Sequence, residues 1–200
     1  MDKWFNGFAY DERMSAASPS PSANARSLGA APGDPPAATA PDPDPAGLTH
    51  LDAAGAARMV DVSAKAVTAR TAVATGRLHT TAAVVDALRR DGLPKGDALA
   101  TARLAGIMGA KRTPDLIPLC HPIALHAVAV ELAPGTDTVE ITATTRTADR
   151  TGVEMEALTA VAVAGLALFD MIKALDPAAR LDGVRVLHKS GGATGTRNHP

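Results

Sequence analysis

From Leu48 onward, the hydrophobic and polar residues follow periods that predict a succession of strands and helices. Stretches in which small or β-branched residues alternate with polar ones are typical of strands. Stretches with apolar residues three and four positions apart are typical of helices that bury one face. Strands are expected at 58–62, 67–78, 124–132, 138–147 and 183–188. Three helices are expected, running through Asp91, through Arg112 and to about Leu175.

Each expected helix follows a residue that can accept hydrogen bonds from the free N–H groups of the first helical turn. Thr80 and Thr81 precede the first helix, and Asp97 precedes the second. The third is preceded by Thr151-x-x-Glu154, which matches a capping box. These signals predict where the three helices begin.

The order of the elements indicates the fold class. Without the short strand at 58–62, the chain reads strand, helix pair, strand, strand, helix, strand. The loop 134–137, Pro-Gly-Thr-Asp, joins two of the strands and predicts a hairpin. This is the split βαβ order, so we expect an α+β, ferredoxin-like fold with an antiparallel sheet and helices packed on one face.

Composition divides the chain near Gly47. Residues 1–47 are rich in Pro, Ala, Ser and Asp, so they are expected to form a disordered N-terminal arm before the domain at 48–195. A flexible tail is expected at 196–200. The first ten residues hold four of the five aromatic residues and are either a short docking peptide or an extension without a role: Trp4, Phe5, Phe8 and Tyr10.

Charge and cysteine content narrow the classes of partner and compartment. A formal net charge of −1 gives no general attraction to nucleic acid or to an anionic membrane. The single cysteine excludes an intrachain disulfide and fits a reducing compartment. The apolar run 161–169 is less than half of the ~20 residues that span a bilayer. We therefore expect a cytoplasmic protein with neither a membrane nor nucleic acid as its partner.

An acid and an amine lie one helical turn apart in the last expected helix. Asp170 and Lys173 share one helix face because they are three residues apart. Such a pair can transfer a proton and stabilise developing negative charge at one place. The alternative is an exposed ion pair that contributes ~0–1 kcal/mol. Apolar residues surround the pair and keep both interpretations open.

Two further carboxylates lie at the start of the same helix. Glu154 is explained by the capping box, whereas Glu156 has no such structural role. Glu156 falls within about 40° of Asp170 around the helix, yet about 21 Å away along its axis. One compact pocket in one subunit would not reach both groups. Either the ligand is long or a second subunit completes the site, and the second interpretation predicts an oligomer.

The segment Leu119-Cys120-His121-Pro122 and several basic residues supply the remaining candidate chemistry. His121 can act as an acid, as a base or as a hydrogen-bond donor to a phosphate near neutral pH. Adjacent Cys and His without a second ligand pair are weak evidence for zinc, so no metal site is expected. Lysines beside glycines or helix ends suit a polyphosphate ligand, and they occur in three segments: Lys95-Gly96-Asp97, Lys111-Arg112 and Lys189-Ser190-Gly191-Gly192.

Taken together, these segments resemble the molybdenum-cofactor biosynthesis protein C family, the cyclic pyranopterin monophosphate synthases. The resemblance covers residues 48–195, about three quarters of the chain. It runs in order through Leu48-Thr49-His50, Met59-Val60-Asp61-Val62-Ser63, Lys95-Gly96-Asp97, Ala102-Arg103, Lys111-Arg112-Thr113, residues 116–122, residues 151–159, Asp170-Met171 and Lys189-Ser190-Gly191-Gly192.

The resemblance implies a ferredoxin-like lyase whose dimers assemble into a hexamer, with active sites at the dimer interfaces. The reaction it implies converts 3′,8-cyclo-7,8-dihydro-GTP to cyclic pyranopterin monophosphate and pyrophosphate. No cofactor is required, and Mg²⁺ is compatible with the pyrophosphate. Asp170 would be the catalytic acid/base and Lys173 its partner, with Lys95 near the reacting ribose and triphosphate. The implied substrate contacts are Leu119, Cys120 and His121, then Met155 and Glu156 at the guanine-derived end, and further Glu154, Lys111, Arg70 and Lys189.

Two other function classes make different demands on the sequence. An RNA-recognition module needs aromatic residues on its sheet, and the only aromatic residue after residue 47 is Phe169, on an expected helix. A regulatory or inactive nucleotide-binding domain would hold the substrate without releasing pyrophosphate. The presence of Asp170, Lys173, Lys95 and His121 favours the enzyme over this alternative.

Overall fold

The structure is a computed structural model that describes residues 50–52, 54–90, 95–193 and 195–199. The predicted arm at 1–47 and the predicted end of the first helix at Asp91 lie outside these residues. The elements follow in the order β1 (Thr68–His79), α1 (Ala82–Arg89), α2 (Ala98–Lys111), α3 (Thr113–Leu116), β2 (Ala127–Pro134), β3 (Thr138–Asp149), α4 (Glu154–Ile172), β4 (Arg180–Ser190) and β5 (Arg197–Asn198).

The five strands form one sheet in the order β2-β3-β1-β4-β5, and every neighbouring pair is antiparallel. The first four strands in this order reproduce the ferredoxin-like arrangement, which confirms the predicted fold class. The longest pairing joins β1 to β3, from Thr68 opposite Asp149 to His79 opposite Thr138. Strand β5 extends the sheet into the segment that the sequence predicted to be a tail.

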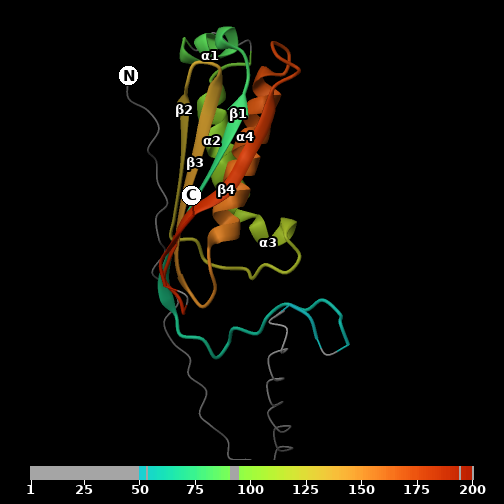
Figure 1. Ribbon diagram of the computed structural model, residues 1–200, viewed down its shortest axis with the longest axis vertical. Helices are drawn as coiled ribbons and strands as arrows, with labels where there is room; N and C mark the ends of the chain where they lie inside the picture. The colour runs from blue at the N-terminus through green and yellow to red at the C-terminus, as the bar shows by residue number, and fades with distance from the viewer. Residues whose placement is uncertain (1–49, 53, 91–94, 194, 200) are drawn as a thin grey trace, which may run out of the picture. The chain divides into compact units, whose positions relative to one another are not determined.

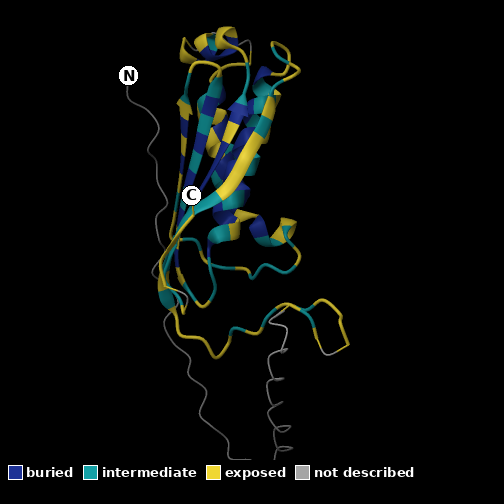
Figure 2. Cartoon of the chain, viewed as in Figure 1, coloured by how far each residue is buried: buried dark blue, intermediate teal, exposed yellow. Residues whose placement is uncertain are grey.

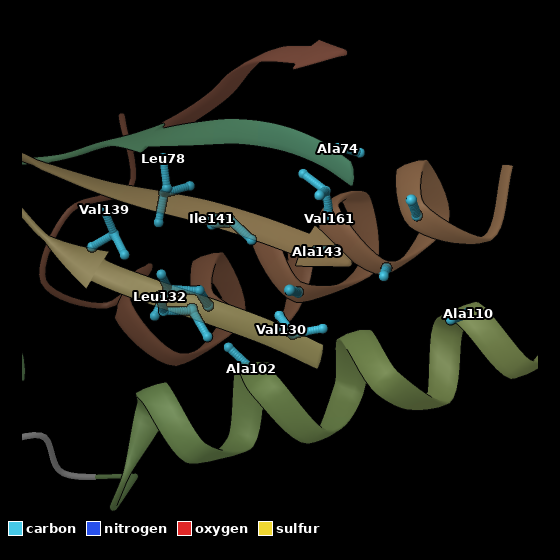
Figure 3. Close-up of a cluster of buried hydrophobic side chains, with 14 of the residues drawn as sticks. Ala74, Leu78, Ala102, Ala110, Val130, Leu132, Val139, Ile141, Ala143 and Val161 are labelled. Atoms are coloured by element: carbon cyan, nitrogen blue, oxygen red, sulfur yellow. The ribbon is translucent and has the colours of Figure 1, made fainter. Parts of the chain in front are cut away.

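The helices α2 and α4 cover one face of the sheet, while α1 and α3 lie at its two ends (Figure 1). Alternate residues of the central strands point toward these helices, as Leu78 on β1 and Ile141 on β3 do in Figure 3. Buried positions accordingly gather on β1, β3 and α4, whereas β4 is mostly exposed over its first half (Figure 2). The core therefore lies between the sheet and the helices α2 and α4, and α4 carries four of the candidate site residues: Glu154, Met155, Glu156 and Asp170.

Small residues let α2 approach α4 closely. A Cβ atom at Gly106 would lie 2.8 Å from the carbonyl oxygen of Ala160, and one at Gly109 would lie 2.8 Å from side-chain atoms of Val163. Real Cβ contacts are longer than this, so both positions require glycine at the observed separation of the helices. This close packing fixes α4 over the sheet.

The predicted helix starts are confirmed in two of three cases. Thr81 Oγ1 accepts a hydrogen bond from the N–H of Val84, and Asp97 Oδ1 accepts one from that of Ala100. The capping box before α4 was wrong, because Val153 is the N-cap and no side chain caps the helix. The side chain of Glu154 does not take part in a capping box because it makes a different contact, described below.

The predicted strand at 58–62 was also wrong, since these residues form an extended coil without a strand partner. The alternation that suggested a strand has another cause. Val60 and Val62 are half-buried and line a cavity, whereas Met59 and Asp61, which alternate with them, are exposed. The alternation of apolar and polar residues in this segment therefore arises because every second residue lines a cavity, not because the segment is a strand in a sheet.

Among the described residues, α4 is long and apolar enough to cross a membrane by length and composition. Its most apolar 18 residues have a mean hydropathy of 1.8, and half of them are buried. The charge-free run 161–169 within this helix is by itself too short to span a bilayer. Packing against the sheet and α2 accounts for the apolar composition of this helix.

Candidate active site

A cavity of about 360 Å³ opens at the N-terminal end of α4. Three segments far apart in the sequence form its walls: the coil that precedes β1, the connection after α3, and the first turn of α4. The lining residues are His50, Val60, Val62, Lys65, Leu119, Cys120, His121, Thr151, Gly152, Glu154, Met155 and Glu156. Six of them were predicted site residues: Leu119, Cys120, His121, Glu154, Met155 and Glu156.

Glu156 is the most deeply buried charged residue of this cavity. Its exposed fraction is 3%, and its Oε2 atom has no hydrogen-bond partner among the described residues. Burial raises the pKa of Glu156 to about 7, against the favourable effect of its own backbone N–H and with a further contribution from the charge of Glu154. Near neutral pH both the neutral and the charged form of this carboxyl group are therefore populated.

Glu154 lies two residues away in the opposite electrostatic environment. Its Oε1 atom accepts a hydrogen bond of 2.7 Å from Lys189 Nζ on β4. Burial opposes ionisation of Glu154, but the hydrogen bond from Lys189 and the charges of Lys189 and Arg70 hold its pKa below the ordinary value. Gly152 leaves space for this side chain, since a Cβ atom there would lie 1.9 Å from Glu154 Oε2.

Arg70 holds the connection between β3 and α4 in place. Its Nε atom donates to the carbonyl of Asp149 at 2.9 Å, and its Nη2 atom donates to that of Arg150 at 3.1 Å. Gly191 packs against the same part of β1, with a φ of +91° and a Cβ position 2.1 Å from the carbonyl oxygen of Ala69. Arg70, Glu154 and Lys189 also line a smaller cavity of about 70 Å³.

His121 ties the coil before β1 to the cavity. Its Nε2 atom lies 2.7 Å from the carbonyl oxygen of Val60. Because a carbonyl oxygen only accepts, Nε2 carries the proton, and Nδ1 is the acceptor in the neutral ring. Burial raises the pKa of the neighbouring Cys120 thiol, and the charge of Glu156 adds to this effect. Cys120 therefore lacks the electropositive setting of a nucleophilic cysteine.

The second part of the candidate site lies at the other end of α4. Asp170 Oδ1 is 2.7 Å from Lys173 Nζ, and Asp170 Oδ2 is 3.0 Å from Lys95 Nζ. Lys95 also donates to the Asp170 carbonyl at 2.7 Å. Hydrogen bonds and charges from Lys173 and then from Lys95 lower the pKa of Asp170. Near neutral pH this cluster holds a carboxylate between two ammonium groups.

The structure thus divides the predicted site residues into two groups. Lys95, Asp170 and Lys173 form one cluster, while the cavity group, with Arg70 and Lys189 beside it, forms the other. Lys111 is exposed in the last turn of α2 and lines neither of the two cavities described above. Glu156 and Asp170 are fourteen positions apart on α4, or about 21 Å along the helix axis.

Sequence reasoning missed several residues of the cavity wall. His50, Val60 and Val62 fell within segments of the family resemblance, but no role was assigned to them. Lys65 carried no signal, because it is one lysine in an irregular segment. Only the folded chain brings this coil beside α4.

The fold and these two groups define a ferredoxin-like protein with a buried carboxyl-lined cavity and a lysine–aspartate cluster, a combination that suits a small anionic ligand. The chain belongs to the MoaC family, whose model matches residues 59–192. No group of three or more His, Cys, Asp or Glu residues that could hold a metal ion occurs in the part of the chain that the structure describes.

Three curated relatives illustrate how close the similarity is. The chain is 66% identical over 148 residues to a cyclic pyranopterin monophosphate synthase of Streptomyces coelicolor, covering 74% of this chain and 87% of the relative. A Mycobacterium tuberculosis protein named cyclic pyranopterin monophosphate synthase 2 is 64% identical over 149 residues, covering 74% and 89%. For the synthase of Rhodospirillum rubrum the values are 61% over 160 residues, 78% and 96%.

Proposed function

We propose that this protein is a cyclic pyranopterin monophosphate synthase of molybdenum cofactor biosynthesis. It converts 3′,8-cyclo-7,8-dihydro-GTP to cyclic pyranopterin monophosphate and pyrophosphate, as a lyase. The observation that carries the proposal is the 61–66% identity to proteins of that name over most of their length. The intact cluster of Asp170, Lys95 and Lys173 supports catalysis over binding alone.

The cluster at the C-terminal end of α4 would perform the chemistry. Formation of the cyclic phosphate requires a substrate hydroxyl to attack the α-phosphorus while the bond to the leaving pyrophosphate breaks. Asp170 is ionised near neutral pH and can accept the hydroxyl proton. Lys95 and Lys173 can stabilise the negative charge that develops on the phosphate oxygens. Precise positioning and charge therefore suffice for this step, without a redox centre.

The cavity at the N-terminal end of α4 would hold the rest of the substrate. Glu156 and Met155 would bind the guanine-derived end, and Leu119, Cys120 and His121 would line its pocket. The triphosphate would lie toward basic residues. Lys189 is one of these basic residues, and its hydrogen bond to Glu154 holds it in place. The further proposed contacts are Arg70, Lys111, Lys189 and Glu154.

The distance between the two groups supports a site shared between subunits. About 21 Å of helix separates Glu156 from Asp170, which exceeds the reach of one compact pocket. Exposed apolar side chains on α2 and α4, such as Leu104, Met108 and Leu166, offer surface for self-association. We propose homodimers that assemble into a hexamer in the cytoplasm. No resident cofactor is required, and Mg²⁺ is compatible with the pyrophosphate product.

The test is anaerobic incubation of the purified protein with 3′,8-cyclo-7,8-dihydro-GTP, following pyrophosphate and the fluorescent oxidised pterin. Both products are expected from the wild-type protein. Asp170→Asn removes the proton acceptor and Lys173→Ala removes one stabilising charge, so each is expected to lower turnover by at least about a hundredfold while leaving assembly intact.

A matched control separates catalysis from general loss of charge. Asp86 on α1 forms an exposed ion pair with Arg89 three residues later, as Asp170 does with Lys173. Asp86→Asn is expected to retain full turnover. Normal turnover of Asp170→Asn or Lys173→Ala would overturn the assignment of the cluster. Tight binding by the wild-type protein without either product would indicate the regulatory alternative.

A further inference from the structure

The buried carboxyl of Glu156 has a consequence for how the cavity binds its ligand. The side chain is almost fully buried, and Oε2 lacks a hydrogen-bond partner among the described residues. A carboxylate in such a place is costly unless donors satisfy its oxygens, whereas a neutral carboxylic acid is tolerated. The backbone N–H groups at the start of α4 favour the charged form, but burial exceeds this effect and raises the pKa to about 7.

The groups around Glu156 do not supply the missing positive charge. Glu154 on α4 is itself negative, and it holds Lys189 at 2.7 Å. The titratable residues that line the other walls are Cys120 and His121 after α3, and His50 and Lys65 in the coil before β1. No ion pair joins any of these residues to Glu156 within the described part of the chain.

A ligand can supply the donor that Oε2 lacks and a second, adjacent donor for the other oxygen. The two oxygens of a carboxylate accept two parallel N–H bonds from a planar edge, the geometry of a guanidinium or of a 2-amino-pyrimidinone ring. We propose that Glu156 couples ligand binding to proton release: its neutral carboxylic acid gives up a proton to solvent when a ligand brings two adjacent N–H donors to the carboxylate. The guanine-type identity of that edge rests on the proposed function.

The proton balance of this step is explicit. Glu156 loses one proton to the buffer, the ligand retains both N–H protons, and the charged hydrogen bonds replace the lost protonation as the source of stability. Because the pKa of the empty cavity is about 7, about 0.5 proton is expected per ligand at pH 7, about 0.9 at pH 6 and less than about 0.1 at pH 8.5.

The experiment is titration calorimetry of the full-length protein with GTP, in buffers of small and large ionisation enthalpy at each pH. GTP carries the 2-amino-pyrimidinone edge, whereas ITP lacks the 2-amino group and serves as the matched ligand. Phosphate groups also titrate in this range, so the measured quantity is the difference in proton release between wild type and Glu156→Gln. ITP is expected to bind about tenfold more weakly and to show a smaller difference.

Two further variants act as controls. Glu131→Gln changes an exposed acid on β2 and is expected to release protons as the wild type does. Glu154→Gln removes a charge that raises the pKa of Glu156, so proton release at pH 7 is expected to decrease without disappearing.

Three results would overturn the inference: no binding of GTP, equal proton release from wild type and Glu156→Gln, or equal differences for GTP and ITP. These outcomes are distinct from failure of the proposed function, which the turnover assay decides. GTP binding with proton release through Glu156 but without product formation would support the inference and remove the synthase proposal. Turnover without Glu156-dependent proton release would do the reverse.

Discussion

At the scale of single residues, α4 shows how strongly position decides the behaviour of chemically identical groups. Glu154 and Glu156 lie two residues apart in the first turn, yet the pKa of the first is lowered and that of the second is raised. The difference arises from Lys189, which donates to Glu154, whereas Glu156 is buried and has no ion-pair partner among the described residues. One carboxyl group is thus a fixed charge that orients a lysine, and the other is an exchangeable proton site.

The raised pKa of Glu156 predicts a pH-dependent cost to the free energy of unfolding. A carboxyl whose pKa rises from 4.5 to about 7 on folding favours the folded state fully below pH 4.5, and this contribution is lost as the pH rises through 7. Relative to wild type, Glu156→Gln is therefore expected to be equally stable near pH 4.5 and more stable above pH 8, by at most about 3 kcal/mol.

Urea unfolding at pH 4.5, 6, 7 and 8.5, at one protein concentration, measures this difference. Glu131→Gln is the control and should follow the wild type at every pH. A constant difference between Glu156→Gln and wild type across the range would contradict the prediction, because it would mean that the carboxyl group does not change its charge there.

At the scale of elements, sequence periodicity was sufficient for β1, α2, β2, β3 and α4, because one face of each is buried in the core. It also found the middle of β4, although no residue of that strand is fully buried. It failed where an alternating pattern had another cause, as in the coil 58–62 that walls the cavity. The capping box failed for a similar reason, since Glu154 has a stronger partner in Lys189, 35 residues later. Local rules cannot register a partner that only the tertiary fold supplies.

The candidate site likewise combines contacts that follow from the local sequence with contacts that only the tertiary fold supplies. Asp170 and Lys173 are one helical turn apart, so their contact follows from helix geometry. Lys95 joins them from the segment before α2, and only the family resemblance had placed it there. Burial of Glu156 depends on the walls at His121 and Val60, which the sequence does not bring together.

The close approach of α2 and α4 predicts opposite effects for one substitution in two backgrounds. Ala is a better helix former than Gly by ~1 kcal/mol, but a Cβ atom at Gly109 would lie 2.8 Å from Val163. Gly109→Ala is therefore expected to destabilise the protein by about 1–2 kcal/mol. In the Val163→Gly background, where the Cβ atom and both methyl groups of residue 163 are absent, it should stabilise by up to ~1 kcal/mol.

Gly106→Ala is the matched comparison for this cycle. Its Cβ atom would meet the backbone carbonyl oxygen of Ala160, which no side-chain truncation removes. Gly106→Ala should therefore destabilise in both backgrounds. Thermal unfolding of the single and double variants gives the coupling energy between positions 109 and 163. A coupling near zero would show that the two helices separate easily and that their contact does not hold α4 in place.

At the scale of the whole molecule, the central fact is that α4 carries two chemically complementary groups at opposite ends. The cavity end offers a buried carboxyl group and apolar walls, and the other end offers a carboxylate between two lysines. Neither end alone meets the demands of the proposed reaction. A symmetric dimer that brings the cavity of one chain to the cluster of its partner would form two complete sites from two incomplete ones.

This arrangement predicts complementation between two inactive variants. In a mixed dimer of Asp170→Asn and Glu156→Ala chains, one site combines both defects, and the other combines the intact cluster of one chain with the intact cavity of its partner. Random pairing of co-expressed chains makes half of the dimers mixed, so about a quarter of wild-type turnover should return. This fraction does not depend on how many dimers form the final assembly.

The control pairs Asp170→Asn with Lys173→Ala, because both defects lie in the same cluster and no mixed site is then intact. Recovery with the first pair but not with the second requires that each site draw on two chains. If both pairs stay inactive although mixed oligomers form, the cavity and the cluster of one chain must act together. A ligand extended along α4 would then have to span the about 21 Å between Glu156 and Asp170 within a single subunit.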